Sequence, residues 1–96
     1  MPRLEVSSRA EREIDDLYLH GILRYGLRQA DDYVRQLRQR MSQLEETPFI
    51  GVERSDVRPH VRLLVFKAHN ILYRVTGDSV LIARVLHRNA DWMNLL

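Results

Sequence analysis

The stretch Val80-Leu81-Ile82-Ala83-Arg84-Val85-Leu86-His87-Arg88-Asn89-Ala90-Asp91 decides the fold. Residues 80–86 form a nearly continuous apolar run, much of it β-branched, which is typical of a strand buried on both faces in the centre of a sheet. Arg84 interrupts this run. A buried guanidinium needs a carboxylate partner, or it must point into a groove where a ligand or partner supplies one. The run ends at His87, and the end of a strand is where a rigid scaffold presents side chains for function.

Two more strands precede this run and are joined to it by short turns. They are expected at residues 60–66 and 69–76, with Lys67-Ala68 as a tight connection between them. Gly77-Asp78 has the composition of a two-residue hairpin loop that leads into the run at residues 80–86. Three strands joined in this way form an antiparallel meander.

The N-terminal part of the chain predicts a short strand and a helix. Residues 3–6 alternate polar and apolar side chains, as a strand does. Ser8 has the position of a helix N-cap, and Glu11, three residues later, has the spacing of a capping box. The helix is expected to end at Gly26. Its apolar surface is wider than one stripe, which indicates a second helix packed alongside and, in addition, a partner surface.

The second helix covers about residues 27–45, and Thr47-Pro48 stops it. A loop is expected over residues 49–57. Because the connection at Gly26 is short, the two helices run antiparallel. The predicted fold class is α+β: an N-terminal strand, then an antiparallel two-helix hairpin packed on one face of an antiparallel sheet with a three-stranded C-terminal meander. The other face is expected to be shallow, partly open and enriched in Arg and His.

Length and composition limit the function. With 96 residues the chain is expected to form one domain, residues 1–96. It has no cysteine, no signal peptide and no run that approaches a membrane span, so a cytosolic protein is the default expectation. The net charge of +2 is unevenly placed: residues 1–57 carry 9 Arg and 11 Asp or Glu (−2), and residues 58–96 carry 6 Arg or Lys and 2 Asp (+4). A basic half indicates either an anionic partner or a solvated face.

Basic and imidazole side chains gather on the predicted sheet and its ends. The sequence has no glycine-rich phosphate loop and no metal motif, so neither a cofactor nor a metal is expected. Cleavage of a phosphodiester needs a base, an acid and a cationic clamp, and histidines with arginines supply all three. In the structural alternative, His69 and His87 bond to strand ends and the arginines pair with carboxylates. The side chains concerned are His60, Arg62, His69, Arg74, Arg84 and His87.

The order strand–helix–helix–three strands resembles the RelE/ParE superfamily of small bacterial toxins, and the local sequence is closer to the ParE branch. The resemblance runs nearly end to end, through the joint order and spacing of short pieces. These are Ser8-Arg9-Ala10 with Ile14-Asp15-Asp16-Leu17; Tyr25-Gly26, Gln29-Ala30 and Tyr33; Leu37; the 44–51 segment around Pro48; Arg58 and Val61-Arg62; His69 with Leu72-Tyr73-Arg74-Val75; and Ile82 with Arg84-Val85-Leu86-His87 and Asp91.

The resemblance implies the toxin of a type II toxin–antitoxin pair, a non-catalytic cytoplasmic protein that inhibits bacterial DNA gyrase and arrests growth. A ParD-like antitoxin is then expected to wrap the helical hairpin and an edge of the sheet. The chain is expected to contact nucleic acid only indirectly, through gyrase or the antitoxin. The residues expected to contact gyrase are Arg84, His87, Asp91, Trp92, Met93, Leu95 and Leu96. Those expected to bind the antitoxin are Leu17, Leu19, Ile22, Leu23, Arg62 and Arg74.

Two alternatives stay open at this point. The RelE branch cleaves messenger RNA on the ribosome, and in this chain such an activity would use His87 or His69 as acid and base with Arg62 or Arg84 on the phosphate. The match to that branch is partial, because no lysine cluster precedes the second strand of the chain and Leu86-His87-Arg88 replaces the tyrosine or histidine-tyrosine ending of that branch. In the other alternative, the chain is inactive and serves its antitoxin as ligand and co-repressor.

Overall fold

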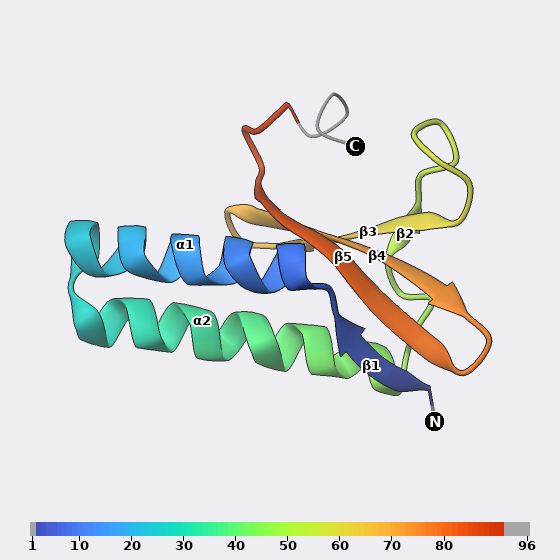
Figure 1. Ribbon diagram of the computed structural model, residues 1–96, viewed down its shortest axis with the longest axis horizontal. Helices are drawn as coiled ribbons and strands as arrows, with labels where there is room; N and C mark the ends of the chain where they lie inside the picture. The colour runs from blue at the N-terminus through green and yellow to red at the C-terminus, as the bar shows by residue number, and fades with distance from the viewer. Residues whose placement is uncertain (1, 92–96) are drawn as a thin grey trace.

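A mixed five-stranded sheet carries a pair of antiparallel helices on one face in the computed structural model (Figure 1), which describes residues 2–91. The elements follow the order β1 (Arg3–Val6), α1 (Ser8–Tyr25), α2 (Leu27–Ser42), the 3-10 turn η1 (Gln43–Glu45), β2 (Val52–Glu53), β3 (Val61–Phe66), β4 (His69–Thr76) and β5 (Ser79–His87). The sheet order is β1-β5-β4-β3-β2, so the run at residues 80–86 is an inner strand, as predicted. The predicted α+β architecture is confirmed.

The strand pairing differs from the prediction in one respect. β2, β3, β4 and β5 pair antiparallel, whereas β1 lies parallel to β5, with Leu4 opposite Val80. Tight turns force antiparallel pairing, and both meander turns are tight: Phe66 faces His69 and Thr76 faces Ser79. β1 is joined to the rest of the chain through the helical hairpin instead, so its direction is not bound by a turn.

The cap of α1 is Ser7, one residue before the predicted Ser8. The Ser7 hydroxyl accepts a hydrogen bond from the Ala10 amide at 3.0 Å and donates one to the Ala83 carbonyl at 2.8 Å. Ser7 therefore caps the helix and also connects it to β5. The spacing of residues within the helix cannot predict the contact with β5. Glu11 does not complete a capping box, because its two carboxylate oxygens accept hydrogen bonds from the Nη1 and Nη2 atoms of Arg38 on α2, at 2.9 and 2.7 Å.

The core lies between the helical hairpin and one face of the sheet. Both helices contribute apolar side chains to it, as do all three meander strands. Ile71 and Tyr73 of β4 point into this core, so Leu72 between them points to the opposite face. There Leu72 packs with Val61 and Leu86 in a smaller cluster that Ala90 covers in part. Within residues 2–91, no helix combines the length and hydropathy that crossing a membrane requires.

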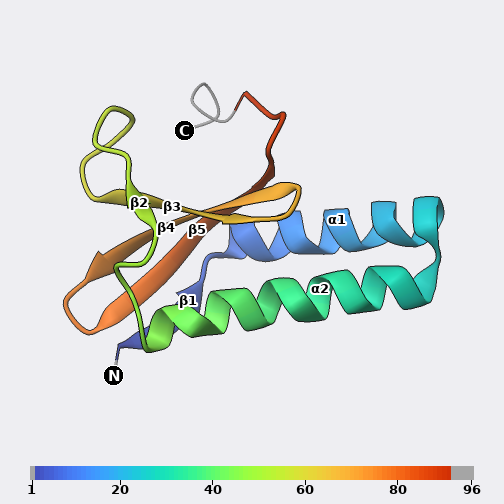
Figure 2. The same ribbon diagram turned by 180° about the vertical axis from the view of Figure 1, so that it is seen from behind.

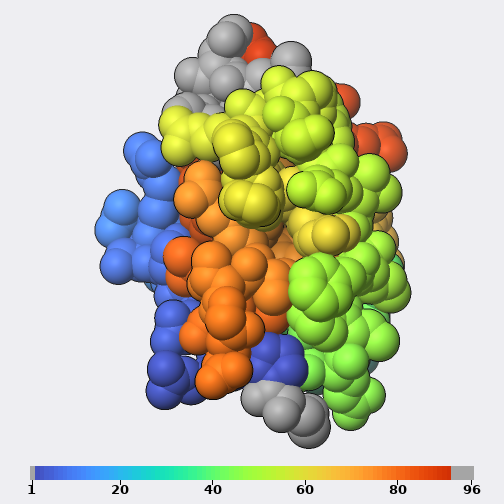
Figure 3. Space-filling view, turned by 90° about the vertical axis from the view of Figure 1, so that its right-hand side faces the viewer, coloured from blue at the N-terminus to red at the C-terminus, as the bar shows by residue number. Residues whose placement is uncertain are grey.

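The expected loop at residues 49–57 contains the two-residue edge strand β2, held by side chains of the neighbouring strands. The Tyr73 hydroxyl is buried, accepts a hydrogen bond from the Gly51 amide at 2.8 Å and donates one to the Pro48 carbonyl at 2.8 Å. The Arg62 guanidinium donates to the Gly51 carbonyl at 2.9 Å and lies over the Phe49 ring. Seen from the side, the β4–β5 hairpin lies between β1 and this segment (Figure 3).

Candidate functional site

A groove opens where the two helices extend beyond the end of the sheet, an overhang that is visible from both sides (Figures 1 and 2). It has a volume of about 690 Å³. α1 and α2 form its floor and one wall, and the β3–β4 turn and the end of β5 form the other wall. The lining residues are Glu13, Asp16, Leu17, His20, Gly21, Arg24, Tyr25, Gln29, Ala30, Tyr33, Ala68, His69, Val85, Leu86 and His87.

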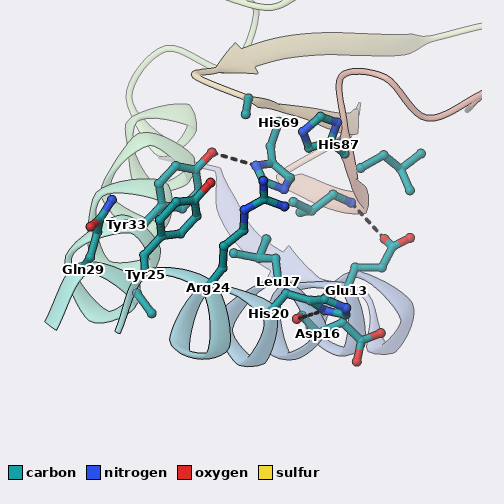
Figure 4. A pocket seen from close by; sticks show the side chains of 15 residues that line it. Glu13, Asp16, Leu17, His20, Arg24, Tyr25, Gln29, Tyr33, His69 and His87 are labelled. Carbon is teal, nitrogen blue, oxygen red and sulfur yellow. Dashed lines mark hydrogen bonds between the residues drawn. The ribbon is translucent and has the colours of Figure 1, made fainter. Parts of the chain in front are cut away.

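Two small residues allow the floor of the groove to form. A Cβ atom added at Gly21 would lie 3.2 Å from the Cβ of Ala30, so α1 and α2 approach closely at this point. Leu17, half-buried, packs against the core just inside the groove. Arg24 points from α1 into the groove, while Tyr25, 60% exposed, lies at the end of the helix (Figure 4). The groove thus combines an apolar floor with polar groups at its rim, which is a common design for a binding site.

Tyr33, His69 and His87 form one end of the groove. The Tyr33 hydroxyl and the His69 Nδ1 atom are in hydrogen-bond contact at 2.6 Å, and the His69 and His87 rings meet edge to face with centroids 5.4 Å apart (Figure 4). Burial of the ring lowers the pKa of His69, and the neighbouring His87 lowers it further. Burial also raises the pKa of the Tyr33 hydroxyl. Both shifts favour the neutral forms of Tyr33 and His69.

Mild acid should destabilise the fold through His69. Its pKa in the folded state lies below the ordinary value of 6.5, so as the pH falls through 6.5 the unfolded chain takes up a proton that the folded chain does not. Stability is complete above that pH and is lost progressively down to the folded-state pKa. We expect urea midpoints to fall between pH 7.5 and 5.5, and to fall less in His69→Gln. Equal slopes in the two proteins would contradict this assignment.

Arg84 is held by a carboxylate, the first of the two environments that the sequence allows. Its Nε and Nη2 atoms donate to one oxygen of Glu13 on α1, at 3.0 and 2.7 Å, and the other oxygen accepts the Val85 amide at 2.9 Å. This occurs just beyond the end of β1, where β5 becomes the edge of the sheet. Glu13 thus takes the place of a neighbouring strand. With 10% of its side chain exposed, Arg84 fastens α1 to the sheet and is not available as a phosphate clamp.

An irregularity in β5 decides which face its last residues present. Ile82 is opposite Tyr73 and Arg84 is opposite Leu72, so Ala83 is one extra residue. Such a bulge reverses the alternation of the residues that follow it. His87 consequently lies opposite His69 on the helix side of the sheet. The expectation that both histidines enrich the open face is therefore wrong, and they line the groove instead.

The remaining predicted residues are dispersed. Of the apolar residues expected to bind an antitoxin, Leu17 lines the groove, whereas Leu19, Ile22 and Leu23 do not; Leu23 is 87% exposed. Arg62 fastens the segment before β2, and Arg74 lies on the open face. His60 does not line the groove. Asp91 is the last described residue, and Trp92, Met93, Leu95 and Leu96 lie outside the described residues.

The residues that sequence reasoning missed are His20, Arg24, Tyr25 and Tyr33. The two tyrosines sit in core-like helical stripes, which concealed their place at the groove. A signal was nevertheless present, because Glu13, Leu17, His20 and Arg24 recur at three- and four-residue spacing and so share one face of α1.

Comparisons with known proteins agree over almost the whole chain. The family model for the ParE toxin of the type II toxin-antitoxin system, parDE, matches residues 4–92. Toxin ParE1 of Caulobacter vibrioides is 34% identical over 95% of this chain and 94% of its own length. Toxin ParE1 of Mycobacterium tuberculosis is 31% identical over 93% and 92%. A solved structure of the chromosomal ParDE TA system from P. aeruginosa has the same fold, with a TM-score of 0.81 and 24% identity over 91% of this chain and 96% of that one.

Proposed function

Because the chain belongs to the ParE toxin family of type II toxin–antitoxin systems, we propose that it inhibits DNA gyrase in the bacterial cytoplasm and that a ParD-type antitoxin neutralises it. The match of the family model over residues 4–92 is the observation that carries this proposal. The inhibition is non-catalytic: the toxin acts by binding and needs neither cofactor nor metal.

The groove is the proposed binding site of the antitoxin. Its length follows the helices, its floor is apolar, and its rim carries Arg24, Tyr25 and His87, a combination that suits an amphipathic helix with acidic side chains. Tyr25 and Arg24 belong to the residue types that dominate binding energy at interfaces. Because Gly21 and Ala30 have small side chains, the floor is low enough for a helix of the antitoxin to lie against α1 and α2.

The side chains that a ribonuclease would need have other partners, which supports the non-catalytic mechanism. Arg84 is paired with Glu13, and Arg62 donates to backbone carbonyls before β2. His69 is half-buried on the helix side of the sheet, where its Nδ1 atom is in hydrogen-bond contact with the Tyr33 hydroxyl. A base, an acid and a free cation are thus not assembled around one reacting phosphate by these residues.

Gyrase is proposed to meet the end of β5 and the residues that follow. Arg84 supports this end from within by fixing it to α1. His87 lies at the tip of β5 and is exposed. Beyond it come Asp91 and the apolar residues Trp92, Met93, Leu95 and Leu96. Tryptophan is among the residue types that dominate the binding energy at interfaces, so Trp92 is the expected anchor of this contact.

Gyrase supercoiling of relaxed plasmid, titrated with the antitoxin-free chain, tests the proposal. We expect dose-dependent inhibition that the antitoxin reverses. No inhibition by folded protein would refute the gyrase target. The same preparation is then assayed for cleavage of ribosome-bound messenger RNA, where loss of cleavage in His87→Gln would establish the ribonuclease alternative.

The groove makes a separate prediction about antitoxin affinity. Replacing Tyr25 with alanine removes an exposed aromatic side chain from its rim, and we expect about 30-fold weaker binding, since interface tyrosines are worth about 2 kcal/mol. Leu23→Ala is the matched control: Leu23 is on the same helix but outside the groove, and its loss should change affinity less than twofold. Isothermal titration calorimetry measures both. The reverse order of effects would place the antitoxin on the outer side of α1.

A further inference from the structure

One end of the groove presents the Nε2 atoms of two histidines as hydrogen-bond donors. The Tyr33 hydroxyl oxygen accepts the Ala68 amide and keeps its own proton for the Nδ1 atom of His69, 2.6 Å away. At the end of β5, the Nδ1 atom of His87 accepts the Asn89 amide at 3.1 Å. Because Nδ1 is the acceptor in both rings, these hydrogen bonds assign the ring proton to Nε2 in each histidine.

The Nε2 atom of His69 is accessible from the groove. Within residues 2–91, no side-chain nitrogen or oxygen is fully buried without a hydrogen-bond partner. The Nε2 atom of His69 has no partner among the hydrogen bonds found in this part of the chain, although the ring is half-buried, so the atom reaches the open space that the ring lines. His87 is exposed and lines the same space. Both donors therefore remain for a ligand.

Arg24 adds a positive charge to these donors. Its side chain extends from the last turn of α1 into the groove and points toward the His69 ring (Figure 4). Arg24 takes part in none of the ion pairs found within residues 2–91. Of the two acidic residues among the described residues that line the groove, Glu13 is bound to Arg84, and Asp16 is eight residues, about 12 Å, away from Arg24 along α1. This end of the groove therefore attracts an anion.

The size and the floor of the groove determine which kind of anion fits. Its volume of about 690 Å³ lies within the range of about 300–1,000 Å³ that is typical of sites for small organic molecules. Next to the donors, the floor consists of Leu17, Gly21 and Ala30, and the rings of Tyr25 and Tyr33 stand at its side (Figure 4). A bare inorganic anion leaves this apolar surface exposed to water. A carboxylate that carries a compact apolar body covers the surface and also satisfies the donors.

We propose that the groove binds a small hydrophobic carboxylate, which accepts hydrogen bonds from Arg24 and from the Nε2 atoms of His69 and His87 while its apolar body lies on the floor. The site itself does not depend on the proposed function, and only its consequence rests on that function. Because the antitoxin is proposed to occupy the same groove, the small carboxylate and the antitoxin exclude each other. By mass action, an excess of the carboxylate weakens the binding of the antitoxin and releases the toxin.

Isothermal titration of the antitoxin-free chain with 2-naphthylacetate tests this inference. The neutral 2-naphthylacetamide, which has the same apolar body, is the ligand control. Arg24→Gln removes the guanidinium from the groove, and its matched control is Arg28→Gln, which removes an exposed arginine that does not line the groove. Both variants must melt like the unaltered chain. We expect saturable binding of the carboxylate, about tenfold or more weaker binding of the amide and of the carboxylate to Arg24→Gln, and a change of less than about twofold in Arg28→Gln.

Nitrogen-15 NMR of the imidazole rings locates the bound carboxylate. We expect the Nε2 resonances of His69 and His87 to shift on addition of 2-naphthylacetate, because these atoms donate to it. Acetate and inorganic phosphate at the same concentration should shift them much less, since neither has an apolar body to cover the floor.

The outcomes separate this inference from the proposed function. If the carboxylate does not bind, or if the amide or Arg24→Gln binds equally well, the inference is overturned and the proposed function is untouched. Equal shifts with acetate or phosphate overturn it in favour of a site for simple anions. In a competition with the ParD-type antitoxin, saturating 2-naphthylacetate should lower the apparent affinity of the antitoxin, and an unchanged affinity overturns the shared site. If the carboxylate binds and the antitoxin does not, the proposed function fails while the small-molecule site stands.

Discussion

Replacing Glu13 with alanine should lower the free energy of unfolding by about 3–5 kcal/mol, because it removes the carboxylate with which the buried Arg84 guanidinium forms an ion pair. Only 10% of the Arg84 side chain and 17% of the Glu13 side chain are exposed, so water does not replace the lost contact. The Val85 amide at the edge of β5 loses its acceptor in the same step. Since small domains are stable by about 5–15 kcal/mol, the variant should be close to unfolding at 37 °C.

Urea denaturation followed by circular dichroism measures this change, and two variants calibrate it. Glu5→Ala breaks the exposed pair with Arg3 and should cost less than about 1 kcal/mol. Glu13→Leu with Arg84→Met removes both charges and should recover most of the loss, as buried ion pairs replaced by apolar residues usually do. A cost below about 1 kcal/mol for Glu13→Ala would mean that the pair does not hold α1 to the sheet.

Removing residues 91–96 should abolish gyrase inhibition and leave the fold intact. The deletion takes away Trp92, Met93, Leu95 and Leu96, the apolar group on which the proposed gyrase contact depends. A central tryptophan together with the contacts around it can contribute about 4 kcal/mol, which corresponds to a loss of potency of about 1,000-fold. Both cores and the packing of Ala90 on the open face lie before the cut.

The supercoiling assay and a thermal melt of the same preparation give the two readouts. A truncated chain that still inhibits gyrase would place the contact elsewhere, and Trp92→Ala would then be uninformative. A truncated chain that loses its cooperative melt would assign these residues to the fold. Trp92→Ala alone should reduce potency by at least tenfold, since tryptophan is the strongest anchor type at interfaces.

Most of the fold follows from patterns that act over a few residues. The apolar run at residues 80–86, the two-residue loop at Gly77-Asp78 and the helix end at Gly26 predict the meander and the hairpin, because burial, turn length and a positive φ each impose a local geometry. The partner strand of β1 was not predictable in the same way. Nor was the cap at Ser7, which depends on a carbonyl 76 residues away.

The candidate site was less predictable than the fold, and the bulge at Ala83 is the main reason. Without it, period-two alternation places Arg84 with the helix-side core and His87 on the open face. With it, Val85 joins the core and His87 faces the groove. Nothing in the sequence around Ala83 predicts that this residue forms a bulge. The expectation that Arg84 needs a carboxylate was sound, because it rests on the energetics of a buried charge and not on register.

Glu13 also explains how the sheet avoids pairing with other chains. An exposed strand edge is a template for intermolecular β-pairing and aggregation. Where β1 ends, the Glu13 carboxylate occupies the Val85 amide that a foreign strand would need. At the other edge, β2 is only two residues long, and the Tyr73 hydroxyl and Arg62 bind the backbone beside it. Side chains of the protein itself thus bind backbone groups at both edges of the sheet.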